Sequence, residues 1–256
     1  MKIDKQIWPF PAEMRKGIQF VSLVLLALLA VVCPVWAADR EASNERLERA
    51  GKVMTEIMAA PDNGIPEEVL AHARCIAVVP HMLKGGLVFG AENGRGVATC
   101  RIPDSDHPGQ FKGWSAPAFF AISGGSWGLQ IGVEGIDLVM VIQNDRGMQQ
   151  LLSSKFELGG DISAAAGPVG RHASADTNWK LDTEILTYSR AKGIFAGLTL
   201  NGAAIRRDDS SMNALYGHEV TNHAVLTGQV TPPSSAEPFL NAVRGAKAQS
   251  VEEQKN

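Results

Sequence analysis

The sequence predicts an α+β fold, in which a strongly curved, glycine-rich and mainly antiparallel sheet of barrel-like shape carries an N-terminal helical segment and short peripheral helices. Twenty of the 26 glycines lie between Gly85 and Gly202, in the block that also holds the short apolar runs typical of strands. Glycine inside strands marks bulges, sharp bends or close backbone approach, so we expect the sheet to curl. Residues 39–58 instead repeat apolar side chains at steps of three and four, which is the period of an amphipathic helix.

Residues 1–37 are predicted to be a signal peptide. Four basic side chains precede an uncharged run from Gly17 to Val32, and a Val-x-Ala step of small residues then ends at Ala37. A basic start, a short apolar core and a small-residue cleavage site are typical of a secretory signal, with cleavage expected near Ala37. Two alternatives stay open: an uncleaved membrane anchor, for which the apolar run is short, and lipid attachment at Cys33.

Cleavage removes four basic and two acidic side chains and leaves 20 basic and 25 acidic ones in 219 residues, a net charge of −5. This length suits one domain with a substantial core, which we place at residues 38–248, with 249–256 as a polar tail. The mild acidity argues against general nucleic-acid binding, which needs a basic footprint.

Several apolar runs after residue 75 are predicted to form the sheet. Asn93-Gly94 lies between two of them and predicts a hairpin turn. Asp137–Ile142 is continuously apolar after its first residue, so both its faces are expected to be covered. Asn144 or Asp145 is expected to cap a short helix.

Two more helices are expected in the last quarter of the chain. Asp208-Asp209 is predicted to start a short helix that reaches Tyr216. Pro232-Pro233 precedes a last helix, from Ser235 to about Ala246.

The stretch from Gly159 to Arg171 reads GGDISAAAGPVGR. A phosphate-binding loop would need glycines spaced to a Lys-Ser or Lys-Thr pair, and Arg171 is followed by His172 instead. Apolar residues alternate with Ser163 and Ala165, which predicts a strand that tolerates only small side chains. An anion bound by the backbone amides around Gly167–Arg171 is the alternative.

No residue pattern indicates catalysis, a metal site or a cofactor, so we predict that the protein is not an enzyme. His218 and His223 are five positions apart, whereas a zinc-binding helix needs two histidines four positions apart. Ser126 lies in a Gly-x-Ser-x-Gly stretch, but an alternating strand follows it where a hydrolase needs a helix. A serine hydrolase that uses Ser126 is therefore a remote alternative.

Cys75 and Cys100 are the two cysteines that remain after cleavage. An even pair in an exported protein predicts a disulfide. Two buried free thiols are the alternative, because sequence alone does not show that the two side chains meet.

Five segments together resemble the SYLF-domain family, the lipid-binding domain of certain actin-patch and endosomal proteins, which has many exported bacterial members. The resemblance covers roughly residues 45–245 and rests on CIAVVP with KGG, GWSAPAF, GGSWGLQIG, AAAGPVGR and YSRAKGIFAG, which lie in this order at 75–86, 113–119, 124–132, 164–171 and 188–197. It implies a single domain that binds membrane lipid, phosphoinositides in eukaryotic members, some of which also bind actin. It implies no enzymatic activity.

An anionic lipid head group needs cations close to it, and apolar or aromatic side chains at the membrane interface. The head-group candidates lie in or beside the turns of the motifs, and they are Lys84, Arg171, Arg190 and Lys192. Trp114 and Trp127 are the interfacial candidates. The expected partner is anionic phospholipid or a membrane surface in the periplasm or outside the cell, where an exported protein would not meet actin. An envelope adaptor that binds another protein is the main alternative.

Overall fold

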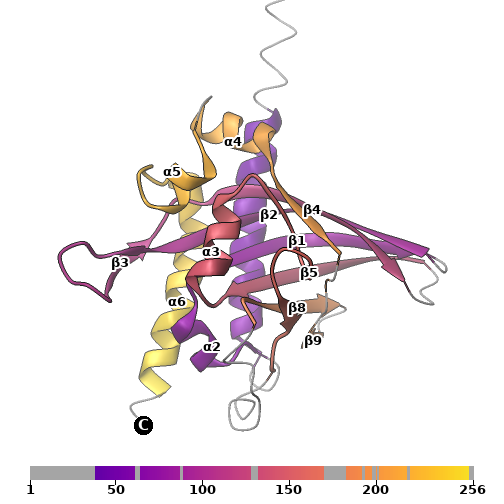
Figure 1. The fold of residues 1–256 in the computed structure, drawn as a ribbon, viewed down its shortest axis with the longest axis horizontal. Helices are drawn as coiled ribbons and strands as arrows, with labels where there is room; N and C mark the ends of the chain where they lie inside the picture. Colours follow the sequence, from indigo (N-terminus) through magenta and orange to yellow (C-terminus); the bar gives the residue numbers. More distant parts are fainter. Residues whose placement is uncertain are drawn as a thin grey trace, which may run out of the picture.

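The predicted α+β fold is confirmed. The computed structural model describes residues 38–60, 64–86, 89–127, 132–169, 183–191, 194–197, 200, 202–217 and 220–253, so the expected signal peptide lies outside the described residues. A strongly curled, mostly antiparallel sheet forms the body of the protein, and an N-terminal helix and several shorter helices pack against it (Figure 1). Within the described residues, no helix is long and apolar enough to cross a membrane.

The sheet has ten strands, eight of them in the order β6-β10-β4-β2-β1-β5-β8-β7, with β3 paired to β2 and β9 paired to β8. All pairs are antiparallel except β7 with β8. Their bounds are β1 Cys75–Gly86, β2 Phe89–Pro103, β3 Phe111–Trp114, β4 Ala118–Trp127, β5 Gly132–Ile142, β6 Lys155–Glu157, β7 Ala164–Ala166, β8 Ile185–Ala191, β9 Ile194–Gly197 and β10 Ala204–Arg207.

The helices begin where the sequence places capping residues. Asn144 caps α3 by accepting a hydrogen bond from the Gly147 N–H at 2.9 Å, and Asp208 caps α4 in the same way. The last helix continues to Glu253, beyond the expected end near Ala246. The N-terminal helix covers residues 38–58 (indigo in Figure 1). The other helices are α2 Glu67–His72, α3 Asp145–Leu152, α4 Asp209–Tyr216, α5 Asn222–Leu226, the 3-10 helix η2 Ser234–Ala236 and α6 Glu237–Glu253.

The sheet has two faces, which the strand register assigns because successive side chains alternate. The helix face carries the N-terminal helix, whose Arg46 guanidinium lies 5.5 Å from the centre of the Phe119 ring. The far face carries α3 and α5, and a pocket between them and the sheet has room for about one water molecule. Near the helices both faces are buried, as predicted for the apolar run that ends at Ile142.

The hairpin predicted at Asn93-Gly94 is wrong, because both residues lie inside the continuous strand β2. Gly94 is needed there for packing. A Cβ atom at this position would lie 2.6 Å from the Cγ1 atom of Val79 and 3.1 Å from Cγ of Met82 on the neighbouring strand.

A β-bulge at Pro80-His81 divides strand β1 into two parts. Proline cannot donate a hydrogen bond to the sheet, and the register with both neighbouring strands shifts around it. Beyond the bulge, four strands continue past the helices (Figure 1). We call this part the extension, and it consists of residues 83–86, 89–93, 123–127 and 132–135.

Part of the glycine-rich stretch is the small-residue strand that was predicted. Ala164–Ala166 form β7, which pairs with β8, and the Gly167 N–H then donates to the Thr187 carbonyl oxygen at 2.9 Å. A Cβ atom at Gly167 would lie 2.2 Å from Cζ of the fully buried Tyr188 ring, so only glycine fits. Gly170 and Arg171 lie outside the described residues.

Candidate functional site

Lys84, a head-group candidate, already has an anionic partner. Its Nζ atom lies 2.8 Å from Oε1 of Glu92, its register partner on β2, and the two side chains are 17% and 5% exposed. Glu134 occupies the register position on the other side, in β5. The Glu92 carboxylate therefore neutralises this ammonium group on the far face, and a lipid phosphate would have to compete with it.

Replacing Lys84 by Met should lower the free energy of unfolding by about 1–3 kcal/mol, because the buried Glu92 carboxylate loses its partner. Urea denaturation measures this change. The double variant Lys84→Met with Glu92→Gln is the matched control and should recover most of the loss. A Lys84→Met protein of unchanged stability that no longer binds anionic vesicles would instead identify Lys84 as a head-group ligand.

Arg190, the second head-group candidate in the described residues, joins two strands to a helix. Its Nη2 atom lies 2.5 Å from Oδ2 of Asp137 on β5, and its Nη1 atom pairs with Glu56 on the N-terminal helix. Arg190 is thus on the helix face, whereas Lys84 is on the far face. The structure does not bring these two cations together, and Arg171 and Lys192 lie outside the described residues. That any of the four contacts lipid stays a prediction.

The two tryptophan candidates occupy different parts of the sheet. Trp114 ends β3, where it is half-buried and its ring centre lies 5.4 Å from the Arg101 guanidinium carbon. Trp127 is the last residue of β4 and the register partner of Phe89 at the outer end of the extension. Only Trp127 therefore belongs to the part of the sheet that projects past the helices.

Ser126 is inside strand β4, opposite Gly90. It does not sit on the turn between a strand and a helix that exposes the nucleophile of a hydrolase. Among the described residues no group of three or more His, Cys, Asp and Glu side chains is placed to hold a metal ion.

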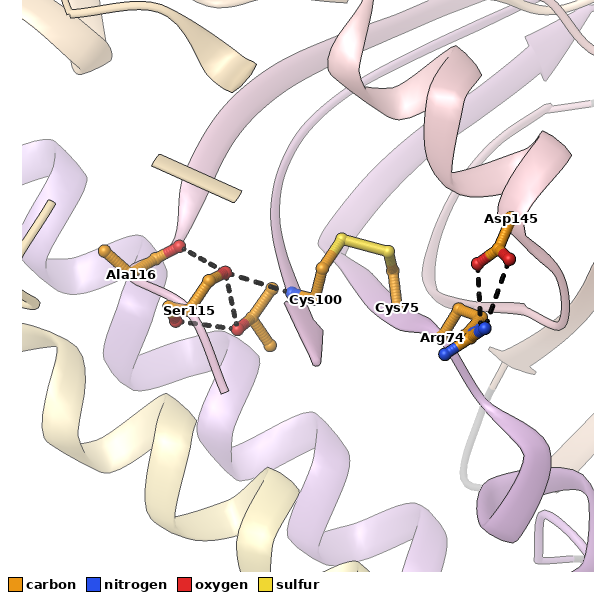
Figure 2. The surroundings of a disulfide bond; sticks show 7 residues. Arg74, Cys75, Cys100, Ser115, Ala116 and Asp145 are labelled. Atoms are coloured by element: carbon orange, nitrogen blue, oxygen red, sulfur yellow. Dashed lines mark hydrogen bonds and ion pairs between the residues drawn. A yellow bond between two sulfur atoms is a disulfide. The ribbon is translucent and has the colours of Figure 1, made fainter. Parts of the chain in front are cut away.

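Cys75 and Cys100 form a disulfide, so the predicted pairing is present in the structure. The two residues face each other across β1 and β2, and both are fully buried (Figure 2). Beside the bond, the Ser115 hydroxyl accepts a hydrogen bond from the Cys100 N–H at 3.1 Å, which ties β2 to the chain that leaves β3. The cross-link therefore lies at the centre of the sheet, away from the extension.

Three cations that the sequence analysis missed lie in one row on the helix face. The register places Arg95 of β2 opposite Ala121 of β4, Ala121 opposite Arg206 of β10, and Arg206 opposite Lys155 of β6. At 4.7–4.9 Å between neighbouring strands, the row is about 15 Å long. All three side chains are exposed, and we call them the cation row. No sequence signal predicts this row, because its members are far apart in the chain and only the register aligns them.

The cation row has fewer carboxylate partners than charges. Arg95 shares Asp208 with the buried Arg46, so two guanidinium groups face one carboxylate. Within the described part of the chain, Lys155 and Arg206 have no carboxylate within 4.0 Å, and Arg206 donates to the Ser123 hydroxyl at 3.1 Å. The row therefore carries unneutralised positive charge on a chain of net charge −3.

Comparison with known proteins assigns the fold to a family. Residues 123–246, which run from the middle of β4 into α6, match the family model Ysc84, described as Las17-binding protein actin regulator. The match contains two members of the cation row, Lys155 and Arg206.

Curated relatives cover more of the chain. SH3 domain-containing YSC84-like protein 1 of Bos taurus is 30% identical over 196 residues, which are 74% of this chain and 55% of the relative. The human protein of that name is also 30% identical over 196 residues, and Protein YSC84 of Saccharomyces cerevisiae is 32% identical over 182 residues, 70% of this chain and 37% of the relative. The chain thus spans about half the length of these mammalian relatives and less of the yeast one. None of these names states an enzymatic activity.

Proposed function

The chain belongs to the Ysc84 family, whose shared unit is the SYLF domain, and from this premise we propose that it binds anionic membrane lipid through the cation row. The observation that carries the proposal is the alignment of Lys155, Arg206 and Arg95 on one exposed face of the sheet. A cation near an anionic membrane surface contributes about 1 kcal/mol of attraction, so a row of three can hold a protein reversibly.

The charges around the row leave room for such binding. Glu157 lies on the same face, two residues along β6 from Lys155, and it is the nearest acidic register position on that strand. Asp208 is engaged by Arg46 and by the hydroxyl groups of Ser210 and Ser211, and its side chain is only 3% exposed. Asp208 is therefore largely neutralised by its protein partners, and Glu157 is the exposed carboxylate of β6 that lies beside the row.

We also propose that the protein acts after export, in the periplasm or outside the cell. Two features support this: the signal-like sequence of residues 1–37 and the buried disulfide, since such bonds persist in oxidising compartments. In that location membrane lipid is an available partner and actin is not.

Changing Lys155 and Arg206 together to Gln should weaken binding to anionic vesicles roughly thirtyfold, because two contributions of about 1 kcal/mol are lost. Co-sedimentation of the exported protein with vesicles of phosphatidylcholine and phosphatidylglycerol measures this. Vesicles of phosphatidylcholine alone should bind weakly, and salt should release the protein from the anionic ones.

The matched control removes two exposed cations elsewhere. Lys112 and Arg244 each lie beside carboxylates, on β3 and α6, so the variant Lys112→Gln with Arg244→Gln has the same net charge and should bind nearly as tightly as the parent. Equal weakening in both variants would mean that total charge, and not the cation row, controls binding.

A protein partner is the second candidate function, because the family description names Las17 binding and actin regulation. This chain would then serve as an adaptor protein. Failure to bind any vesicle, together with binding to filamentous actin or to an envelope protein, would favour this function over lipid binding.

A further inference from the structure

Two members of the cation row, Lys155 and Arg206, form a pair that the rest of the described chain does not neutralise. They are direct register partners on β6 and β10, and both side chains are exposed on the helix face. Residues opposite each other in this way have Cβ atoms about 5 Å apart, and two like charges there destabilise the sheet. Among the described residues neither cation is paired with a carboxylate. An anion from outside the protein would remove the repulsion.

The acidic residue of β6 on the same face, Glu157, is turned toward the end of its own strand. A Cβ atom at Gly160 would lie 3.5 Å from the carboxyl carbon of Glu157, so this carboxyl group lies against the turn that follows β6. The Glu157 N–H donates to Oδ2 of Asp161 at 2.8 Å, which holds the turn in place. Asp208, beyond β10, is buried and pairs with Arg46. Neither Glu157 nor Asp208 therefore serves the pair as a counter-ion.

The surroundings of the pair supply a further hydrogen-bond donor and leave the cations open. Arg206 Nη2 donates to the Ser123 hydroxyl at 3.1 Å, so this oxygen is an acceptor and its own proton remains for a second hydrogen bond. Beside Arg206 on the same face are Ala121 of β4 and Ala204 of β10, and both are too small to cover the guanidinium group. An ammonium, a guanidinium and a hydroxyl group thus lie together on an open part of the face.

We infer that Lys155 and Arg206 bind a phosphate monoester at the end of a lipid head group, in preference to the phosphate diester of a lipid such as phosphatidylglycerol. This inference rests on the proposed function and names the class of lipid. A phosphate monoester carries a charge of about −1.5 to −2 at pH 7 and has three terminal oxygens, whereas a diester carries a single charge. The guanidinium fork of Arg206 can donate to two of these oxygens while the Lys155 ammonium group donates to the third.

A membrane suits this site better than a free phosphate ion does, although both offer the same chemistry. The pair is on an exposed face and the cation row continues to Arg95, two strands and about 10 Å away from Arg206. A lipid surface supplies further anionic groups for Arg95, and their attraction adds to that of the pair. A free phosphate ion would occupy the pair alone.

Sedimentation with two kinds of vesicle tests the inference. Phosphatidylcholine vesicles with phosphatidic acid present a monoester, those with phosphatidylglycerol present a diester, and the two are matched in zeta potential at each pH. The exported protein should bind the monoester vesicles about tenfold more tightly at about pH 7.5. The preference should disappear at about pH 5, where the monoester has largely lost its second charge. Effects of pH on the protein itself act on both kinds of vesicle and cancel in the ratio.

Three variants locate the preference. Lys155→Gln with Arg206→Gln should bind both kinds of vesicle equally weakly. It should unfold at no lower a urea concentration than the parent, because it removes a repulsion, so its lost binding would not reflect a damaged fold. Arg206→Lys keeps the charge without the fork and should lose part of the preference. Lys112→Gln with Arg244→Gln removes the same charge elsewhere and should retain the preference.

Four results would overturn the inference. Equal binding of both vesicles by the parent, weakened in both by Lys155→Gln with Arg206→Gln, would leave the proposed function standing and exclude the preference for a monoester. A preference that survives in this variant would place the monoester site elsewhere. Inorganic phosphate that binds without vesicles as tightly as phosphatidic acid does would identify free phosphate as the ligand. If no vesicle binds at all, the proposed function fails and the inference fails with it.

Discussion

Replacing Asp208 by Ala should lower the free energy of unfolding by about 3–5 kcal/mol, the cost of leaving a buried charge without its partner. Asp208 Oδ2 lies 3.0 Å from Nη1 of Arg46, and the two side chains are 3% and 8% exposed. The carboxylate also caps α4 and accepts hydrogen bonds from Ser210 and Ser211. One side chain thus joins the N-terminal helix, α4 and β2. Urea denaturation measures the loss.

Two controls separate these contributions. Arg95→Gln removes the half-exposed partner of Asp208 and should cost at most about 1 kcal/mol. Glu237→Ala removes a carboxylate whose ion pair with Arg244 is exposed, and should change stability by no more than about 0.5 kcal/mol. An Asp208→Ala protein as stable as Glu237→Ala would show that Arg46 finds other partners and that the network does not hold the helix.

The Asp208 carboxylate should also contribute to the pH dependence of the free energy of unfolding. Burial alone would raise the pKa of Asp208, but hydrogen bonds from Ser211 and Ser210 and the positive charge of Arg95 outweigh it and lower the pKa. A lowered folded-state pKa means that the stabilisation is present above the unfolded pKa of about 4 and is lost as the pH falls through the folded pKa. Below about pH 4 the parent protein should therefore lose stability more steeply than Asp208→Asn does.

The architecture was predictable because its signals are local. Asn144 and Asp208 cap helices where a side-chain oxygen precedes a run of helical residues, and the buried strand ending at Ile142 is a continuous apolar run. The continuous strand through Asn93-Gly94 was not predictable from the same kind of signal, which indicated a hairpin there. In the sequence, a glycine that permits a turn looks the same as a glycine that leaves space for the side chains of Val79 and Met82. Only the neighbouring strand in the structure distinguishes the two cases.

The candidate site was less predictable, since a cation's availability depends on what faces it across the sheet. Lys84 and Arg190 are beside motif turns, and neither sequence position reveals that Glu92, Asp137 or Glu56 will neutralise it. The cation row shows the converse. Arg95, Lys155 and Arg206 belong to no common motif, and three separate strand pairings are needed to align them.

Removal of the disulfide should lower the free energy of unfolding by roughly 3–4 kcal/mol, because the bond restricts the unfolded chain between two cysteines 25 positions apart. Reduction of the parent protein isolates the effect of the cross-link, since both sulfur atoms remain in the core. The double variant Cys75→Ala with Cys100→Ala should lose somewhat more, because it also leaves small cavities among fully buried neighbours.

Intact mass and urea denaturation, each with and without reductant, give the measurement. The exported protein should gain two hydrogen atoms on reduction, and the denaturation midpoint should fall. Alkylation of two thiols in the unfolded, unreduced protein would contradict the bond. Because the disulfide is far from the cation row and the extension, reduced protein that remains folded should bind anionic vesicles with the affinity of the oxidised form. A loss of binding on reduction, with the fold intact, would mean that the cross-link helps to shape the membrane-binding face across β1 and β2.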